Sequence, residues 1–371
     1  MRLKPVHITA YSWLLQQVRI HPVPSTAHLS HIHTGYISNL AFTREMASLK
    51  KKIGTHNGCF HCDEAMAVSM LMLLSEFKDA EVIRTRDEAI LATCDAVVDV
   101  GGVFDPERMR FDHHQNEFNE YFDEKHTVTR LSSAGLVYKY FGKRVIREIY
   151  GVTEEANVEE VYQQVYNRFI EALDAIDNGV AVADSPLKYE NSTHLPARIA
   201  RLNPSWVDEN VDVDARFRDA MKLTLSEFDY YVRNAIDVHL SAIRKFEELY
   251  RNRFNVHQSG LVIETPRGMP FSHTLYQLEE KEGTPADKRL AFYITYDSAT
   301  NQYRCSCIKE KDSQFASRRP FPKRLSGLRD KELEKASGIP GLTFIHRAGF
   351  TCGGLTKESI LKLIDITLQE S

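Results

Sequence analysis

The feature that most constrains the fold is an alternation of strand-like and helix-like segments between residues 53 and 100. Short apolar runs predict three strands, at Ile53–Thr55, Glu81–Arg84 and Ala96–Val100. The sequence between them favours helices, at Asp63–Phe77, where apolar residues recur at helical spacing, and at Asp87–Ala92. Parallel strands need a crossover helix between them, so this pattern predicts an α/β fold with a parallel sheet flanked by helices.

A proline-containing stretch divides the rest of the chain. Residues 185–204 contain three prolines and form the best candidate linker, so we place a domain boundary near residue 195. Before it, helices are expected at 132–142 and 158–177. After it, we expect a helical region over 213–251, strands near 254–264, 289–296 and 302–308, a hairpin turn at Asp297–Asn301 and a final helix over 357–369. The predicted domains are residues 46–195 and 196–371, and the second is an α+β domain that closes over the first.

The first 44 residues differ from the rest because they contain no Asp or Glu. Their charge comes from Arg2, Lys4, Arg19 and Arg44. An acid-poor, basic composition predicts a disordered mitochondrial targeting segment over residues 1–45, and an ordinary disordered tail is the alternative. A second start at Met46 would leave Lys50–Lys52 as a weak nuclear signal. We therefore expect the protein in the mitochondrial matrix and in the nucleus and nucleolus.

Composition excludes several classes of protein. Hydrophobic residues make up 43% of the chain and charged residues 26%, the balance of a soluble globular protein. The net charge is −4, so binding to nucleic acid needs a local basic patch. Six cysteines in 371 residues are too few for a disulfide framework and predict reduced thiols in an intracellular protein. No run approaches the roughly 18 apolar residues of a membrane-spanning helix, so we expect no membrane partner.

Acidic and imidazole side chains follow several of the predicted elements. Asp112, His113 and His114 are consecutive, and Asp99 ends the buried run AVVDV, where a charge needs a partner. A loop dense in His and Asp lies between the first strand and the first helix, and Asp174 and Asp177 share one face of a later helix. Each residue alone could be a helix cap or a satisfied core histidine. Because ligands bind at the carboxyl ends of parallel strands, all of them together predict a metal site.

Two divalent ions suit this mixture of ligands. Ions roughly 3.5–4 Å apart can generate hydroxide and neutralise charge on a phosphate. Carboxylates favour Mg²⁺ or Mn²⁺, and imidazoles shift the preference toward Mn²⁺ or later metals. The pair Cys59 and Cys62 leaves two alternatives open, half of a zinc site or a redox motif, although no second Cys-x-x-Cys supports the first.

Several motifs in one order resemble a known family. The segments THNGCFHCDEA, VVDVGG, FDHHQ, AIDNG, RLNPSW and RPFPKRLSGLR resemble the melanocyte-proliferating-gene (Myg) family of DHH-like phosphoesterases, from about residue 53 to the C-terminus. The resemblance implies a DHH phosphoesterase-like fold in which residues 46–195 form a two-metal catalytic domain. It also implies a manganese- or magnesium-dependent 3′–5′ exoribonuclease of the nucleus and mitochondria.

The resemblance implies roles for individual residues. The metal ligands would be His56, His61, Asp63, Asp99, Asp112, His113 and Asp177, with Asp99 bridging two ions and Asp174 a weaker candidate than Asp177. The catalytic triplet would be Asp112, His113 and His114, the last directed toward metal or phosphate. One departure matters. The superfamily's first loop usually carries His-x-x-x-Asp-x-Asp, whereas this chain has His56, His61 and Asp63 at a longer spacing, with an imidazole in place of one carboxylate.

The second domain contains candidate substrate-binding residues. Gly353 and Gly354 precede the final helix, where backbone N–H groups can approach an anion. A basic run with Phe315 and Phe321 interleaved has the composition that holds single-stranded nucleic acid. The predicted substrate-binding residues are Arg198, Arg318, Arg319, Lys323, Arg324, His346, Gly353 and Gly354. The alternative for the basic run is a solvated loop.

These features predict a metal-dependent 3′–5′ exoribonuclease that hydrolyses phosphodiester bonds of single-stranded RNA with two divalent ions, Mn²⁺ or Mg²⁺. One alternative is a DHH-type phosphoesterase acting on short oligonucleotides or other small phosphate substrates. A second alternative is a non-catalytic RNA-binding protein that keeps its metal ligands for stability.

Overall fold

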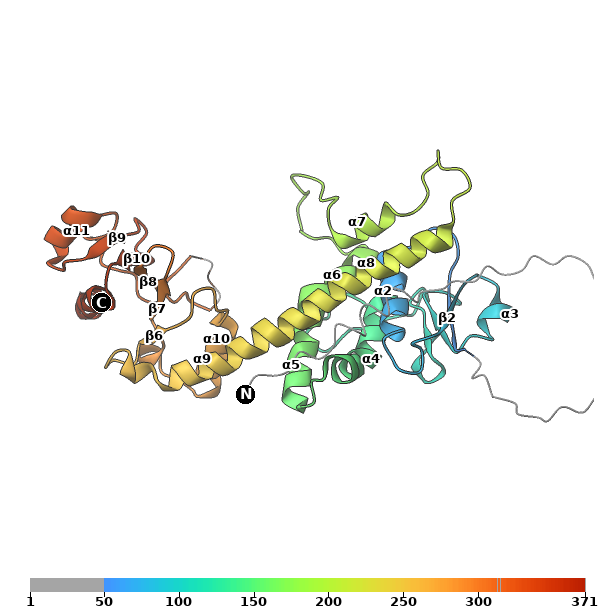
Figure 1. Cartoon of the computed structure of the whole chain (residues 1–371), viewed down its shortest axis with the longest axis horizontal. Coiled ribbons are helices and arrows are strands. Elements are labelled where there is room, and N and C mark those ends of the chain that lie inside the picture. The colour runs from blue at the N-terminus through green and yellow to red at the C-terminus, as the bar shows by residue number, and fades with distance from the viewer. Residues whose placement is uncertain (1–49, 312, 314, 371) are drawn as a thin grey trace, which may run out of the picture. The chain divides into compact units, whose positions relative to one another are not determined.

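The computed structural model describes residues 50–311, 313 and 315–370. The predicted targeting segment 1–45 and Met46 lie outside the described residues. The chain divides into two compact units after Ala235, and each unit contains one five-stranded sheet with helices packed against it (Figure 1). The predicted α/β fold is confirmed.

The sheet of the first unit has the order β2-β1-β3-β5-β4. Its strands are β1 (Lys52–Thr55), β2 (Glu81–Arg84), β3 (Ala96–Val98), β4 (Phe104–Asp105) and β5 (Arg110–Phe111). β2, β1, β3 and β5 are parallel, and only the edge strand β4 is antiparallel to its neighbour. The three strands predicted from apolar runs therefore lie side by side, with their carboxyl ends at one edge.

Helices complete the first unit. They are α2 (Cys62–Leu71), α3 (Glu88–Leu91), η1 (Pro106–Arg108), α4 (Ser133–Tyr150), α5 (Glu155–Val165), the π-helical turn η2 (Tyr166–Ile170), α6 (Glu171–Asp177), α7 (Leu195–Ala200) and α8 (Val213–Asn234). α2 is buried along its whole length and packs against α4, α6, α7 and α8. A helix that is apolar on all sides needs such complete cover.

The structure corrects two predictions in this unit. The first helix ends at Leu71 rather than Phe77, because the chain continues in turns closed by i to i+3 bonds, such as Leu73 N–H to Met70 O. The predicted linker 185–204 contains α7, which packs with α8 against α2. The compact units consequently divide after Ala235 instead of near residue 195.

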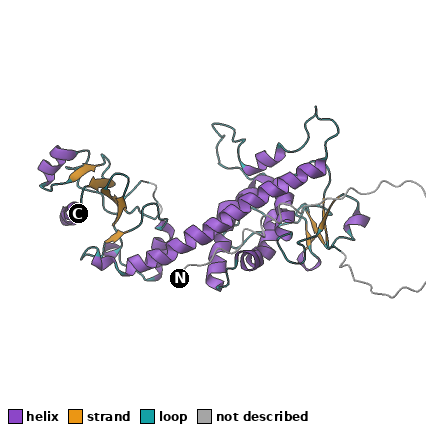
Figure 2. Ribbon diagram, in the orientation of Figure 1, coloured by secondary structure: helices purple, strands orange, loops and turns teal. Residues whose placement is uncertain are grey.

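The second unit begins at Ile236 and contains a mainly antiparallel sheet of order β6-β7-β8-β10-β9. Its strands are drawn in orange in Figure 2. The strands are β6 (Val262–Glu264), β7 (Phe292–Asp297), β8 (Gln302–Cys307), β9 (Leu342–Ile345) and β10 (Thr351–Gly354). The helical elements are η3 (Ala235–Leu240), α9 (Ser241–Arg251), η4 (Arg253–Asn255), α10 (Ser272–Lys281), η5 (Ala286–Lys288), α11 (Asp330–Ser337) and α12 (Lys357–Glu370).

Alternate residues of the second sheet face two separate cores, as the two-residue repeat of a strand requires. Phe292 and Ile294 pack with the apolar faces of α11 and α12, whereas Ile263 packs with α9 and α10. The predicted hairpin is confirmed, because β7 pairs with β8 up to Asp297 and Gln302. The strand expected over 254–264 is shorter than predicted, because residues 253–255 form η4. No helix among the described residues has the length and apolar character needed to span a membrane.

Candidate metal centre

Polar side chains follow three neighbouring parallel strands of the first unit at the point where each strand ends. His56 follows β1, Asp99 comes directly after β3, and Asp112 and His113 come directly after β5. Asp99 has a left-handed backbone, with φ of 59°, which only a few non-glycine residues adopt. This turn brings the Asp99 carboxylate into contact with histidines from both neighbouring strands.

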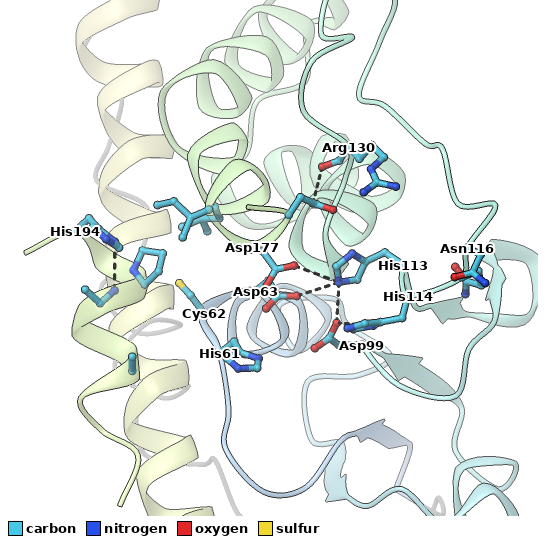
Figure 3. A pocket seen from close by; sticks show the side chains of 17 residues that line it. His61, Cys62, Asp63, Asp99, His113, His114, Asn116, Arg130, Asp177 and His194 are labelled. Atoms are coloured by element: carbon cyan, nitrogen blue, oxygen red, sulfur yellow. Dashed lines mark hydrogen bonds and ion pairs between the residues drawn. The ribbon is translucent and has the colours of Figure 1, made fainter. Parts of the chain in front are cut away.

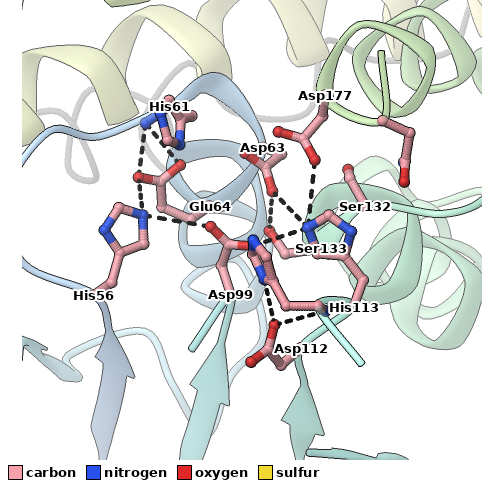
Figure 4. Close-up of polar contacts among 12 residues, drawn as sticks. His56, His61, Asp63, Glu64, Asp99, Asp112, His113, Ser132, Ser133 and Asp177 are labelled. Carbon is pink, nitrogen blue, oxygen red and sulfur yellow. Dashed lines mark hydrogen bonds and ion pairs between the residues drawn. The ribbon is translucent and has the colours of Figure 1, made fainter. Parts of the chain in front are cut away.

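Two helix ends provide the remaining carboxylates. Asp63 and Glu64 lie in the first turn of α2, where the helix dipole favours negative charge. Asp177 is the last residue of α6. The ends of three strands and two helices therefore meet around one point (Figure 4).

His113 is the centre of this arrangement. Its Nε2 atom lies 3.1 Å from Asp99 Oδ1, 3.3 Å from Asp177 Oδ2 and 4.0 Å from Asp63 Oδ2. Ser133 donates a hydrogen bond of 2.8 Å to the same Asp63 oxygen. The other oxygen, Asp63 Oδ1, is buried without a hydrogen-bond partner. A buried carboxylate oxygen without a donor is costly, so this atom indicates a place for a cation.

On the other side of Asp99 lie the first-loop histidines. His56 Nε2 is 3.4 Å from Asp99 Oδ2 and 3.0 Å from Glu64 Oε1. His61 is exposed, and its ring centroid lies 5.8 Å from that of His56. Glu64 was not among the predicted site residues, although its position three residues after His61 is the spacing of a capping box.

The pKa values of the cluster reflect crowded negative charge in a buried place. Burial is the largest influence on Glu64 and raises its pKa to about 8. Burial and the neighbouring carboxylates also raise the pKa of Asp177. Burial lowers the pKa of His56, but its hydrogen bonds with Asp99 and Glu64 outweigh that effect and raise the pKa to about 10. Despite burial, hydrogen bonds from His113 and His56 hold the pKa of Asp99 well below its usual range.

Asp112 is held by hydrogen bonds within the first unit. Its carboxylate accepts hydrogen bonds from the backbone N–H of Gly102 at 2.6 Å and of His114 at 3.2 Å. Oδ1 also lies 2.7 Å from Nδ1 of His114, and this contact raises the pKa of that imidazole. Asp112 therefore orients His114, and its expected role as a metal ligand stays a prediction.

The two acids of α6 also differ. Asp174 is fully buried and accepts hydrogen bonds from the Ser132 N–H and hydroxyl, the Gly135 N–H and the Tyr166 hydroxyl. Its oxygen atoms are occupied by the protein, whereas Asp177 reaches His113. The position of Asp177 agrees with its choice over Asp174 as the metal ligand, and Asp174 stabilises the turn before α4.

The loop between β1 and α2 is held by residues from elsewhere in the unit. The Asn203 amide accepts a hydrogen bond from the Phe60 N–H at 2.9 Å and donates one to the Phe60 carbonyl at 2.8 Å. Arg84 donates to the Gly58 carbonyl at 2.7 Å and to Asp214 at 3.2 Å. Asn203 was not predicted as a site residue, because the sequence does not reveal a partner 143 positions away.

The cluster around His113 lines a cavity of about 800 Å³ in the first unit. Figure 3 shows His113 on its wall, with Asp177, Asp63 and Asp99 directed toward it. Further lining residues are Gln115, Asn116, Arg130, Asn178, His194, Pro196, Ala197 and Ala200. Arg130 was not predicted, and it adds a positive charge to a wall that otherwise carries acids and imidazoles.

The donor atoms fit divalent ions. One candidate set is Asp63, His113 and Asp177, and another is Asp99, His113 and His114; in each set the donor atoms lie within 4.8 Å of one another. Carboxylate oxygens with added imidazole nitrogens are suitable ligands for Mn²⁺ and related ions. The unpartnered oxygen of Asp63 supports the same conclusion.

The predicted substrate-binding residues of the second unit are mostly engaged in its own structure. The Arg318 side chain is buried and pairs with Glu279 at 2.7 Å, and Arg324 pairs with Glu370 at 2.6 Å. Phe321 is part of the core, whereas Phe315 is exposed. Arg319 is half-buried and Lys323 is exposed. The basic run is therefore divided between structural ion pairs and surface.

The other predicted substrate-binding residues also have partners within their own units. Gly353 and Gly354 are buried residues of strand β10 instead of a loop before a helix, and a Cβ atom at Gly353 would overlap Phe344. His346 accepts a hydrogen bond from the Ala348 N–H. In the first unit, Arg198 pairs with Glu227 at 2.9 Å. The roles of His346 and Arg198 in substrate binding stay predictions.

The fold and the site define an α/β protein with a candidate divalent-metal centre at the carboxyl ends of a parallel sheet. Residues 52–368 match the model for MYG1 exonuclease, described as an uncharacterised protein family (UPF0160). The chain is 42% identical over 330 residues to MYG1 exonuclease of Homo sapiens, covering 86% of each protein. It is 37% identical over 332 residues to a MYG1 protein of Saccharomyces cerevisiae, covering 87% of this chain and 97% of that protein. The chain belongs to the MYG1 family, as its motifs predicted.

Among solved structures, the chain is similar to an exopolyphosphatase-related protein from Bacteroides fragilis. The two are 12% identical with a TM-score of 0.18, and the match covers 86% of this chain and 92% of that one. A score this low carries no argument about fold or function.

Proposed function

We propose that this protein is a metal-dependent exonuclease that hydrolyses phosphodiester bonds. The observation that carries the proposal is the meeting of Asp63, Asp99, His113 and Asp177 on an open cavity. The names of the relatives support the reaction, because those of Homo sapiens and Mus musculus are both called MYG1 exonuclease.

The finer features of the proposal come from the sequence motifs. The substrate is single-stranded RNA, which is shortened from its 3′ end, and two ions of Mn²⁺ or Mg²⁺ are bound. The protein acts in mitochondria and in the nucleus. A cavity of about 800 Å³ supports a substrate with a single-stranded end, since cavities of this size hold a ligand with the dimensions of one or two nucleotides.

Each residue of the site has a chemical role in this proposal. Asp63, Asp99, His113 and Asp177 would hold one ion, and Asp99 would be shared with a second ion beside His56 and His61. Bound divalent ions supply a water of lowered pKa and neutralise charge on the phosphate. The remaining steps belong to protein groups that position the phosphate and transfer protons.

His114 is the best placed group for proton transfer. Its side chain is 62% exposed in the cavity, and Asp112 holds the ring and favours its protonated form. An imidazolium beside the phosphate can donate a proton to the leaving oxygen. Arg130 lines the same cavity, where its charge can hold a non-bridging phosphate oxygen.

The test uses protein starting at Met46, a 5′-labelled single-stranded RNA and Mn²⁺. Wild type should produce a ladder that shortens from the 3′ end, and His113→Ala should produce none. Asp174→Asn is the matched control, because it also changes a buried polar group of this unit but lies outside the donor sets. Hydrolysis of dinucleotides alone would favour a small-substrate phosphoesterase, and RNA binding without any turnover would favour a non-catalytic protein.

Localisation has its own test. A fluorescent reporter fused to residues 1–45 should reach mitochondria, and residues 46–371 fused to the same reporter should reach the nucleus. A diffuse cytosolic signal from both would contradict this part of the proposal and leave the reaction untouched.

A further inference from the structure

Glu64 lies beside His56 and His61, on the side of the site opposite Asp177. Its side chain is fully buried, and its two oxygens accept the His61 N–H at 2.7 and 3.0 Å. Oε1 also lies 3.0 Å from Nε2 of His56. The donor atoms of His56, His61, Glu64 and Asp99 all lie within 4.8 Å of one another. Figure 4 shows Glu64 between the two histidines.

The orientation of His56 determines what this group can bind. Nδ1 of His56 lies 3.1 Å from the Asn57 carbonyl, which can only accept, so Nδ1 carries a proton. Nε2 then faces two carboxylates, at 3.0 Å and 3.4 Å. A bare nitrogen lone pair would be repelled by both carboxylates, so this contact needs either a proton, carried by the imidazole or by Glu64, or a metal ion.

We propose that Glu64 is a metal ligand, which completes with His56, His61 and Asp99 a site for one divalent transition-metal ion. The inference rests on the metal centre proposed above and adds a ligand to one half of it. Four-coordinate metal–nitrogen and metal–oxygen distances of roughly 2.1 Å place neighbouring donors roughly 3.4 Å apart, close to the separations of His56 Nε2 from Asp99 and Glu64. Small side-chain movements accommodate the ion.

The site also explains the altered first loop. His61 is an imidazole where related loops carry a carboxylate, and Glu64 returns a carboxylate from one helical turn further along the chain. Two imidazoles and two carboxylates favour Mn²⁺, Co²⁺ or Zn²⁺ over Mg²⁺, which prefers oxygen ligands and retains its water. Asp99 is then shared with the ion held by Asp63, His113 and Asp177.

A purely structural role for Glu64 makes a different prediction. The His61 N–H bond is half of a capping box at the start of α2, and this bond alone would account for burial of the side chain. Glutamine keeps the length and an oxygen that accepts the His61 N–H, but it is a much weaker ligand. The substitution Glu64→Gln thus separates capping from metal binding.

The experiment measures ion binding without any nuclease assay. Ion-free protein is titrated with Mn²⁺, and bound ions are counted by elemental analysis and by electron paramagnetic resonance. Wild type should bind two ions, and Glu64→Gln should lose at least tenfold in affinity at one of them while keeping the other. Asp177→Asn should weaken the other ion, and Glu76→Gln, which removes an exposed charge, should change neither.

Two outcomes would overturn the proposal. Glu64→Gln could bind both ions with wild-type affinity, or it could weaken both equally, which would mean that Glu64 supports the loop as a whole. Glu64→Asp covers the case in which the glutamine variant does not fold, because it keeps the charge and shortens the side chain; it should weaken the same single ion. The titration measures no turnover, so it is independent of the RNA assay. A wild type that binds two ions but cleaves no RNA would contradict the exonuclease proposal and leave the assignment of Glu64 intact.

Discussion

The first unit contains two buried carboxylate clusters that differ in how their charge is compensated. Around Asp174, four protein donors from Ser132, Gly135 and Tyr166 surround one carboxylate. Around Asp99, several carboxylates share a few imidazoles, and an oxygen of Asp63 has no donor. The contrast separates structure from function, because a buried acid that the protein satisfies by itself needs no ligand, whereas an unsatisfied group of acids does.

The largest effect is expected for Asp99→Asn, which tests whether the cluster around Asp99 is the reactive centre. The variant removes the carboxylate that contacts both His56 and His113, so both ions should lose a ligand. We expect nuclease activity to fall on the order of 10³-fold, since metal ions contribute several kcal/mol to the transition state. Single-turnover rates at saturating Mn²⁺ provide the measurement. An activity within tenfold of wild type would mean that the cluster is not the reactive centre.

Asp174→Ala should affect stability instead of chemistry. The variant leaves the Ser132, Gly135 and Tyr166 donors unpaired in a buried place, and we expect the free energy of unfolding to fall by about 3 kcal/mol. Urea denaturation gives this value, and Mn²⁺ affinity measured on the folded variant should equal that of wild type. A loss of one ion with unchanged stability would reverse the roles assigned to the two clusters.

The affinity for metal ions should increase with pH. Without ions, burial raises the pKa of Glu64 to about 8 and, with neighbouring carboxylates, raises that of Asp177, so these acids hold protons near neutral pH. An ion must displace the protons, and competition decreases as the pH rises toward 8. We expect an increase of up to about tenfold per pH unit for each displaced proton. Calorimetry in buffers of different ionisation enthalpy should detect proton release, and pH-independent affinity between 6 and 8 would contradict it.

The smallest expected effect on stability comes from an exposed acid, Glu76. Arg144 donates to both oxygens of Glu76 at 2.6 and 2.7 Å, and this lowers the pKa of Glu76 to about 2. A depressed pKa stabilises the fold above pH 4.5 and the contribution is lost as the pH falls toward 2. Because solvent screens this pair, we expect about 0.5 kcal/mol. Thermal unfolding of wild type and Glu76→Gln should converge near pH 2.

Periodicity in the sequence predicted the parallel sheet and the strand ends, because each strand there is a short apolar run followed by a polar residue. His56 and Asp99 were found at such strand ends, whereas His113 was found from the triplet Asp112-His113-His114, because its strand β5 was not predicted. Residues whose role depends on partners distant in the sequence were not predicted. Asn203 and Arg130 act through contacts that tertiary structure alone creates, and Glu64 has the same spacing as an ordinary helix cap.

Charge patterns were the weakest guide. The run around Arg318 has the composition of a nucleic-acid surface, but Glu279 and Glu370 neutralise two of its cations. Those acids are distant in the sequence and belong to helices, so no local window includes them. The domain boundary was misplaced for a similar reason, since prolines mark the start of α7 but packing on α2 decides the unit to which it belongs.

The pairing of Asn203 with Phe60 has a consequence for the order of folding. The two residues are 143 positions apart in the sequence, so their contact closes a long loop and forms late. During synthesis, the loop that carries His56 and His61 leaves the ribosome long before Asn203 does. The candidate metal centre is therefore completed only after nearly the whole first unit has been synthesised.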